Sequence, residues 1–100
     1  MTAPIKELVY DRDGNTLQIW YLEGPLPPSR NVHQNDGLYM VVDADDESRL
    51  LGWEIVNVRH FASLHPEMRS FLDDLERLPG RAVILQEPTP GAGLSQLLHA

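Results

Sequence analysis

The amino-acid sequence predicts an α+β domain, in which an antiparallel sheet of four or five strands carries one amphipathic helix on one face. Short apolar and β-branched runs separated by turn residues fill the first part of the chain, which is typical of a meander of hairpins. Between residues 64 and 78 the apolar residues recur at spacings of three and four, which is the period of a helix. The length of 100 residues is that of one domain.

Several runs have the composition of strands. The first two flank the segment Asp11–Asn15, where Gly14 and Asn15 accept a positive φ at low energetic cost and predict a hairpin turn. The run at 49–58 is apolar on both faces, so we expect something to cover each side of that strand, at least in part. The five predicted strands occupy residues 5–10, 16–22, 38–43, 49–58 and 82–85.

The helix is predicted over residues 64–78. Pro66 stands near its start, where a missing amide donor is tolerated, and Pro79-Gly80 ends it. We expect its apolar stripe to pack on one face of the sheet and to supply the main favourable term in folding. The stripe consists of Met68, Phe71, Leu72, Leu75 and Leu78, and the facing sheet residues are Leu17, Ile19, Met40 and Ile55.

The domain is expected to span residues 1–86. Residues 87–100 begin with the proline- and glycine-rich segment EPTPGAG, so we interpret them as a linker and a short C-terminal tail.

Composition excludes several classes of function. Eight Lys and Arg against fifteen Asp and Glu give a net charge of −7, which disfavours direct binding of nucleic acid and is compatible with a basic protein partner. The absence of cysteine excludes disulfides, thiolate metal sites and cysteine nucleophiles. No run approaches the ~20 apolar residues of a membrane span, and no Sec-type signal is visible, so we expect a cytoplasmic protein without membrane attachment.

The first turn raises the question of a calcium site, because Asp11, Asp13 and Asn15 alternate as in a calcium loop. Such a loop also requires glycine at its sixth position and glutamate at its twelfth. Those positions hold Thr16 and Leu22. The segment is therefore interpreted as a hairpin turn.

A second acidic segment contains Asp43, Asp45 and Asp46, which are weak candidates for a metal site. It lies between two predicted strands, where aspartates commonly stabilise turns, so a solvated turn is the preferred interpretation. The four histidines do not have the spacing of a zinc site. We expect neither a metal nor another cofactor.

Glu54 is a weak catalytic candidate, because it is the charged residue that interrupts an otherwise apolar strand. A buried carboxylate needs a partner, and with Tyr39 and either His33 or His60 it would form a pocket for general acid–base chemistry. An edge-facing or salt-bridged structural glutamate is the preferred alternative. No G-x-S-x-G elbow is present, and Gly91-Ala-Gly93 lacks the lysine of a phosphate loop.

The two tryptophans are the candidates for an interface. We expect Trp20 and Trp53 to belong to a second apolar surface that is shared with a partner subunit, and we therefore predict a homodimer.

Two segments together resemble a known family. Tyr10-Asp11, Asn15, Leu17 and Ile19 fit the pattern Y-D-x-x-x-[DN]-x-L-x-I, and Val42-Asp43-x-Asp45 leads to Leu51-Gly52-Trp53-Glu54-Ile55, which fits V-x-D-x-D-…-[LV]-G-x-E-I. This pair, over about residues 8–58, resembles a family of small bacterial and archaeal domains of unknown function that open YDPEADALYI and close with VGIEI.

The family has no established activity, so the resemblance assigns no catalytic residue. Its members are often encoded beside small toxin-like proteins, which implies an antitoxin or partner role. The chain departs from the family in its first turn, where Arg12-Asp13-Gly14 replaces the usual proline-glutamate-alanine.

Two functions remain. The first is a non-enzymatic protein–protein interaction module, antitoxin-like by resemblance. The second is a small-ligand-binding protein or an enzyme with a pocket around Glu54. A deep cleft that holds Glu54 beside a histidine would favour the second function, whereas a flat acidic face or an open strand edge would favour the first.

Overall fold

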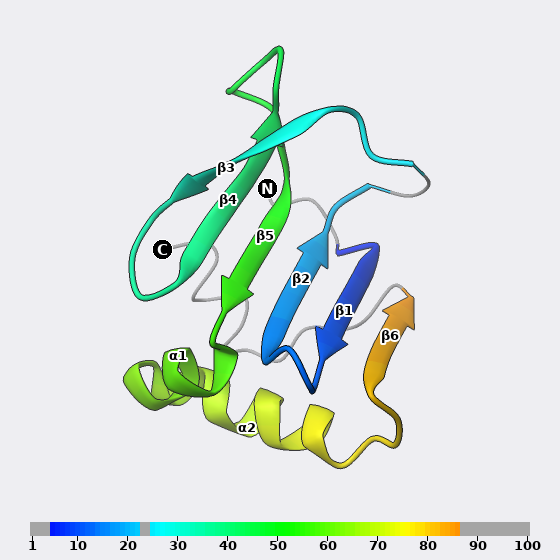
Figure 1. Ribbon diagram of the computed structural model, residues 1–100, viewed down its shortest axis with the longest axis vertical. Coiled ribbons are helices and arrows are strands. Elements are labelled where there is room, and N and C mark those ends of the chain that lie inside the picture. Colours follow the sequence, from blue (N-terminus) through cyan, green and yellow to red (C-terminus); the bar gives the residue numbers. More distant parts are fainter. Residues whose placement is uncertain (1–4, 23–24, 87–100) are drawn as a thin grey trace.

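The computed structural model describes residues 5–22 and 25–86, so the predicted linker and tail at 87–100 lie outside the described residues. Six strands form one antiparallel sheet in the order β3-β4-β5-β2-β1-β6, and two helices pack against it (Figure 1). The predicted α+β class is confirmed, with one strand more than the sequence indicates. The elements are β1 (Glu7–Asp11), β2 (Thr16–Trp20), β3 (Ser29–His33), β4 (Leu38–Asp43), β5 (Leu50–Val56), α1 (Val58–Leu64), α2 (Pro66–Glu76) and β6 (Ala82–Gln86).

The sheet consists of two local units joined at its centre. β1 and β2 form a hairpin, and β3, β4 and β5 form a meander. β5 then pairs with β2 and unites the two units, while β6 returns after the helices to pair with β1. The predicted meander of hairpins therefore holds within each unit and not across the whole sheet.

β3 is the strand that the sequence does not predict. Its segment, SRNVH, has one partly buried residue, Val32, and the rest are exposed. Because the strand lies at an edge of the sheet with few buried side chains, it lacks the apolar alternation by which strands are recognised. Its conformation comes from the hydrogen-bonded ladder with β4, in which Val32 faces Met40.

The helical region also differs from the prediction. The strand predicted to reach Val58 ends at Val56, and Asn57, with φ of 54°, turns the chain into α1. The helix predicted over 64–78 begins at Pro66 and ends at Glu76. Leu78 therefore lies beyond the helix and is 37% exposed, so its predicted place in the apolar stripe is wrong.

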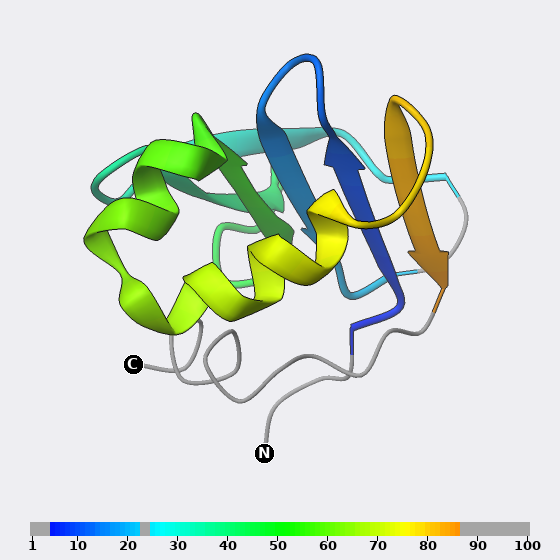
Figure 2. The same cartoon turned by 90° about the horizontal axis from the view of Figure 1, so that it is seen from below.

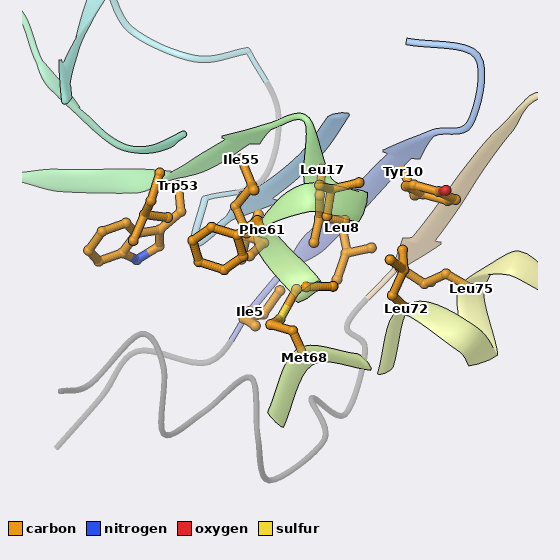
Figure 3. Packing of buried hydrophobic residues seen from close by; sticks show 14 residues of the cluster. Ile5, Leu8, Tyr10, Leu17, Trp53, Ile55, Phe61, Met68, Leu72 and Leu75 are labelled. Atoms are coloured by element: carbon orange, nitrogen blue, oxygen red, sulfur yellow. The ribbon is translucent and has the colours of Figure 1, made fainter. Parts of the chain in front are cut away.

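The core lies between the helices and one face of the sheet (Figures 2 and 3). Met68, Leu72 and Leu75 of α2 are buried as predicted, and Phe71 is partly buried. Of the predicted facing residues, three are fully buried and Met40 is partly buried. The sheet and α1 supply further large buried side chains, which include Leu8, Tyr10 and Phe61.

Trp53 belongs to this core (Figure 3), with 9% of its surface exposed. Its indole nitrogen donates a hydrogen bond of 3.0 Å to the Tyr21 hydroxyl. Burial raises the pKa of Tyr21 above its ordinary value, while this hydrogen bond opposes the shift.

No helix in the described part of the chain is long and apolar enough to cross a membrane.

Candidate functional site

The candidate site is the face of the sheet opposite the helices. Figure 2 shows both helices on one side of the sheet, and no other described helix covers the opposite side. Alternation along the strands directs every second side chain to that side. We call this surface the open face; its residues include Val9, Gln18, Trp20, His33, Tyr39, Glu54, Val56 and Ile84.

A row of polar and aromatic residues crosses the centre of the open face. Strand register places Gln18 opposite Glu54, Glu54 opposite Tyr39, and Tyr39 opposite His33 of the edge strand β3. Directly opposed residues have Cβ atoms about 4.5–5.5 Å apart. The rings of His33 and Tyr39 meet edge to face with their centroids 5.0 Å apart. The fold thus brings together three of the residues that the sequence proposes for a ligand pocket.

His60 does not join this row. It is an exposed residue of α1, on the helix side of the sheet, whereas Glu54 is on the open face. Of the two histidines proposed as companions of Glu54, only His33 lies on the same side.

Trp20 lies on the open face over a glycine. In the register of β2 and β5 it stands opposite Gly52, and a Cβ atom added to Gly52 would come within 2.7 Å of Trp20 Cε3 and would collide with the Ile19 carbonyl oxygen. The missing side chain therefore lets the indole rest against the backbone of β5. This position is two register pairs along from the pair of Gln18 and Glu54, and it is the next pair on the same face.

The two tryptophans consequently do not share a surface. Trp20 lies on the open face and Trp53 in the core, because the residues occupy positions of opposite parity in paired strands. Of the two tryptophans predicted to form an interface, Trp20 lies on a surface of the sheet and Trp53 does not.

Glu54 has one hydrogen-bond partner within the part of the chain that the structure describes. The Asn31 side-chain amide donates to Glu54 Oε2 over 3.5 Å, which is a long hydrogen bond. No described arginine, lysine or histidine forms an ion pair with Glu54. The described residues therefore show no salt bridge for Glu54, and the alternative of an edge-facing structural glutamate stays a prediction.

The acidic segment between β4 and β5 is a turn stabilised by its own side chains. Asp43 Oδ1 accepts the amide of Asp45 at 2.9 Å, and Asp43 Oδ2 lies 3.3 Å from Arg49 Nη1. Asp46 accepts the hydroxyl and the amide of Ser48, and these two bonds lower the pKa of Asp46. The described residues contain no group of three or more His, Asp or Glu that is arranged to hold a metal ion.

The turn between β1 and β2 attaches the helices to the sheet. Asp11 Oδ1 accepts the amide of Gly14 at 3.0 Å, and Asn15 has φ of 56°, as expected of a hairpin turn. Asn15 Oδ1 also accepts the amide of Arg59 at the start of α1, over 3.1 Å, and its amide group donates to Asn57 Oδ1 over 2.7 Å. The asparagine thereby satisfies groups at a helix N-terminus whose N-cap residue, Asn57, makes no side-chain capping hydrogen bond.

Arg12 of the same turn caps the C-terminus of α2 with its side chain. Its guanidinium donates to the carbonyl oxygens of Leu75 and Glu76, each at 3.2 Å, and to those of Leu78 and Gly80 beyond the helix. A cation among the last carbonyls of a helix is favourable both as a donor and through the helix dipole. The sequence gives no signal for this contact, because Arg12 and α2 are more than fifty residues apart.

Glu76 completes this connection. It accepts a hydrogen bond from the Tyr10 hydroxyl, and Arg12 and Arg59 each approach one of its oxygens at 3.3 Å. The Tyr10 bond and the two arginines lower the pKa of Glu76, whereas its partial burial acts in the opposite direction. Burial and the contact with Glu76 raise the pKa of Tyr10. We interpret this cluster as structural.

Comparisons of the chain with protein-family models, with curated proteins and with solved structures found no match. The resemblance of residues 8–58 to small prokaryotic domains therefore stays a prediction. A function has to be inferred from the open face itself.

Proposed function

We propose that this protein is a non-enzymatic interaction module that binds a basic protein partner on its open face. The supporting observation is the apolar and aromatic character of a sheet face that no described helix covers. Val9, Trp20, Tyr39 and Val56 are partly exposed there, and Ile84 is 58% exposed. An uncovered face of an antiparallel sheet is ordinarily polar, and clustered apolar side chains on a surface mark interaction sites.

Charge favours a basic partner. The chain has a net charge of −7, and most of its arginines already face carboxylates of the same chain. A partner of opposite charge gains association rate and specificity from this field. The internally paired arginines are Arg12, Arg30, Arg49, Arg59, Arg77 and Arg81.

The sheet edges offer an additional mode of contact. Within the described residues, β3 and β6 each pair with a single neighbour. The outer backbone groups of such a strand are a template for strand addition by a partner. The antitoxin-like role that the resemblance implies is compatible with both modes.

Affinity purification from the native cell, with mass spectrometry of the bound proteins, tests this proposal. Ile84→Asp places a carboxylate on the open face, and Leu64→Asp makes the same change at a 48% exposed position of α1 on the helix side. We expect a stoichiometric basic partner that Leu64→Asp retains and Ile84→Asp loses, with both variants folded by circular dichroism. Recovery of no partner, or equal retention by the two variants, would contradict the proposal.

The alternative is a small-ligand-binding protein or an enzyme with a pocket around Glu54. The row of His33, Tyr39 and Glu54 favours it, because these side-chain types serve in general acid–base catalysis. Among the described residues, however, no histidine nitrogen forms a hydrogen bond with Glu54. Partner binding therefore agrees better with the geometry.

A further inference from the structure

Two described carboxylates that are buried or partly buried pair with arginine, and Glu54 does not. Glu76 faces two arginines at 3.3 Å, and Asp43 faces Arg49 at 3.3 Å. Glu54 is also partly buried, yet the described residues give it only the long hydrogen bond from Asn31. A carboxylate that is partly removed from water without a cation or strong donors is energetically unfavourable.

The described arginines do not supply the missing cation. Six of the seven are ion-paired with other carboxylates. The seventh, Arg69, is an exposed residue of α2 on the opposite side of the sheet. A cation that neutralises Glu54 therefore has to come from outside this set.

The surroundings of Glu54 select among cations. Tyr39 stands directly opposite it on β4, and Trp20 lies diagonally across β2 with its indole over Gly52. Diagonal neighbours in a sheet are within reach of aromatic side chains. A planar guanidinium pairs with a carboxylate through two parallel hydrogen bonds and stacks on aromatic rings, which an ammonium group does not do.

We propose that Glu54, Tyr39 and Trp20 form an arginine site, which receives one arginine side chain of the partner protein. This inference rests on the proposed function, since it names the group through which a basic partner is recognised. Glu54 provides the charge, and the two aromatic residues exclude water around the guanidinium and strengthen its attraction to the carboxylate.

Titration with N-acetyl-arginine amide, followed by ¹H–¹⁵N NMR, tests the site without knowledge of the partner. We expect saturable shifts of the indole N–H of Trp20 and of the amides of Gly52 and Glu54. N-acetyl-lysine amide is expected to bind more weakly, and the uncharged N-acetyl-citrulline amide to cause no saturable shift. Equal responses to arginine and lysine, or shifts spread over the exposed acidic residues, would reduce the effect to general charge attraction and overturn the proposal.

Two variants with the same change in charge provide the control. Glu54→Gln keeps the shape of the side chain and removes its charge, and we expect it to raise the Kd for the arginine amide about fivefold or more. Asp73→Asn removes an exposed carboxylate on α2 and should leave this Kd unchanged. An equal rise of Kd in both variants would overturn the arginine site.

Different experimental results would contradict the arginine site and the proposed function. If Ile84→Asp loses the captured partner while Glu54→Gln retains it at wild-type affinity, the open face is the interface and the arginine site is wrong. If Ile84→Asp retains the partner, partner binding on the open face is itself wrong. Loss of the partner in both variants, with retention in Asp73→Asn, supports both.

Discussion

Glu76, in the last turn of α2, receives three side chains from separate parts of the chain. Tyr10 comes from β1, Arg12 from the following turn and Arg59 from α1. Since these contacts favour the ionised form, the pKa of Glu76 is lower in the folded chain than its ordinary value of 4.5. One carboxylate thus joins both helices to the β1–β2 hairpin.

This pKa shift predicts a pH dependence of stability. A depressed folded-state pKa means that Glu76 stabilises the fold fully above about pH 4.5, and that its contribution is lost as the pH falls through the folded-state pKa. Glu76→Gln removes the contribution. We expect urea titrations to show a lower free energy of unfolding for Glu76→Gln at pH 7, with the difference from wild type shrinking below pH 4.5.

Asp73→Asn serves as the control here, because Asp73 is an exposed carboxylate of the same helix. It should follow the wild-type pH dependence closely. A destabilisation by Glu76→Gln that stays constant from neutral pH to well below 4.5 would contradict the role assigned to the ionised carboxylate.

At the scale of elements, the sequence predicts the buried face of α2 correctly but not the residue at which the helix ends. The spacing of Met68, Leu72 and Leu75 predicts the buried face correctly, because it follows from the helical period alone. The end of the helix does not follow from this period. Leu78 has the right spacing, yet the chain leaves the helix at the cap Arg77 and then turns toward β6.

A pair of leucine-to-alanine substitutions tests this packing. Leu72→Ala should lower the free energy of unfolding by about 2–5 kcal/mol, since it leaves a cavity between helix and sheet. Leu78→Ala should change it by about 0.5 kcal/mol or less, as at other exposed positions. Urea unfolding monitored by tryptophan fluorescence measures both values. Equal destabilisation by the two substitutions would mean that the packing described for α2 is incorrect.

At the scale of the whole molecule, the fold is a two-layer structure with one sheet face left open. Helices cover one face, and the other keeps Trp20, Tyr39 and Ile84 at least partly exposed. The homodimer that the sequence predicts stays a prediction, and of the two tryptophans on which it was based only Trp20 lies on this surface.

Light scattering at micromolar concentration measures the oligomeric state. We expect twice the mass of one chain for the wild-type protein, for Leu64→Asp and for Ile84→Asp, because the open face is assigned to the basic partner. A monomeric wild-type protein would reject the homodimer. A monomeric Ile84→Asp beside a dimeric wild type would place the subunit interface on the open face and contradict partner binding there.

Several properties follow from the sequence alone. The α+β class, the five predicted strands and the buried stripe of α2 depend on periodicity within single segments. The interpretation of Asp11–Asn15 as a turn depends on local turn chemistry and on the lack of the required glycine and glutamate. Each of these features depends on a few neighbouring residues, so it can be predicted without knowing how the other segments of the chain fold.

Other properties are decided by tertiary structure. β3 is a strand because β4 lies beside it, and Arg12 and Asn15 have structural roles because α2 ends and α1 begins near their turn. The row of His33, Tyr39 and Glu54, and the separation of Trp20 from Trp53, depend on which strands pair and in which register. A shift of one residue would move each side chain to the other face, so only the assembled sheet determines what the open face presents to a partner.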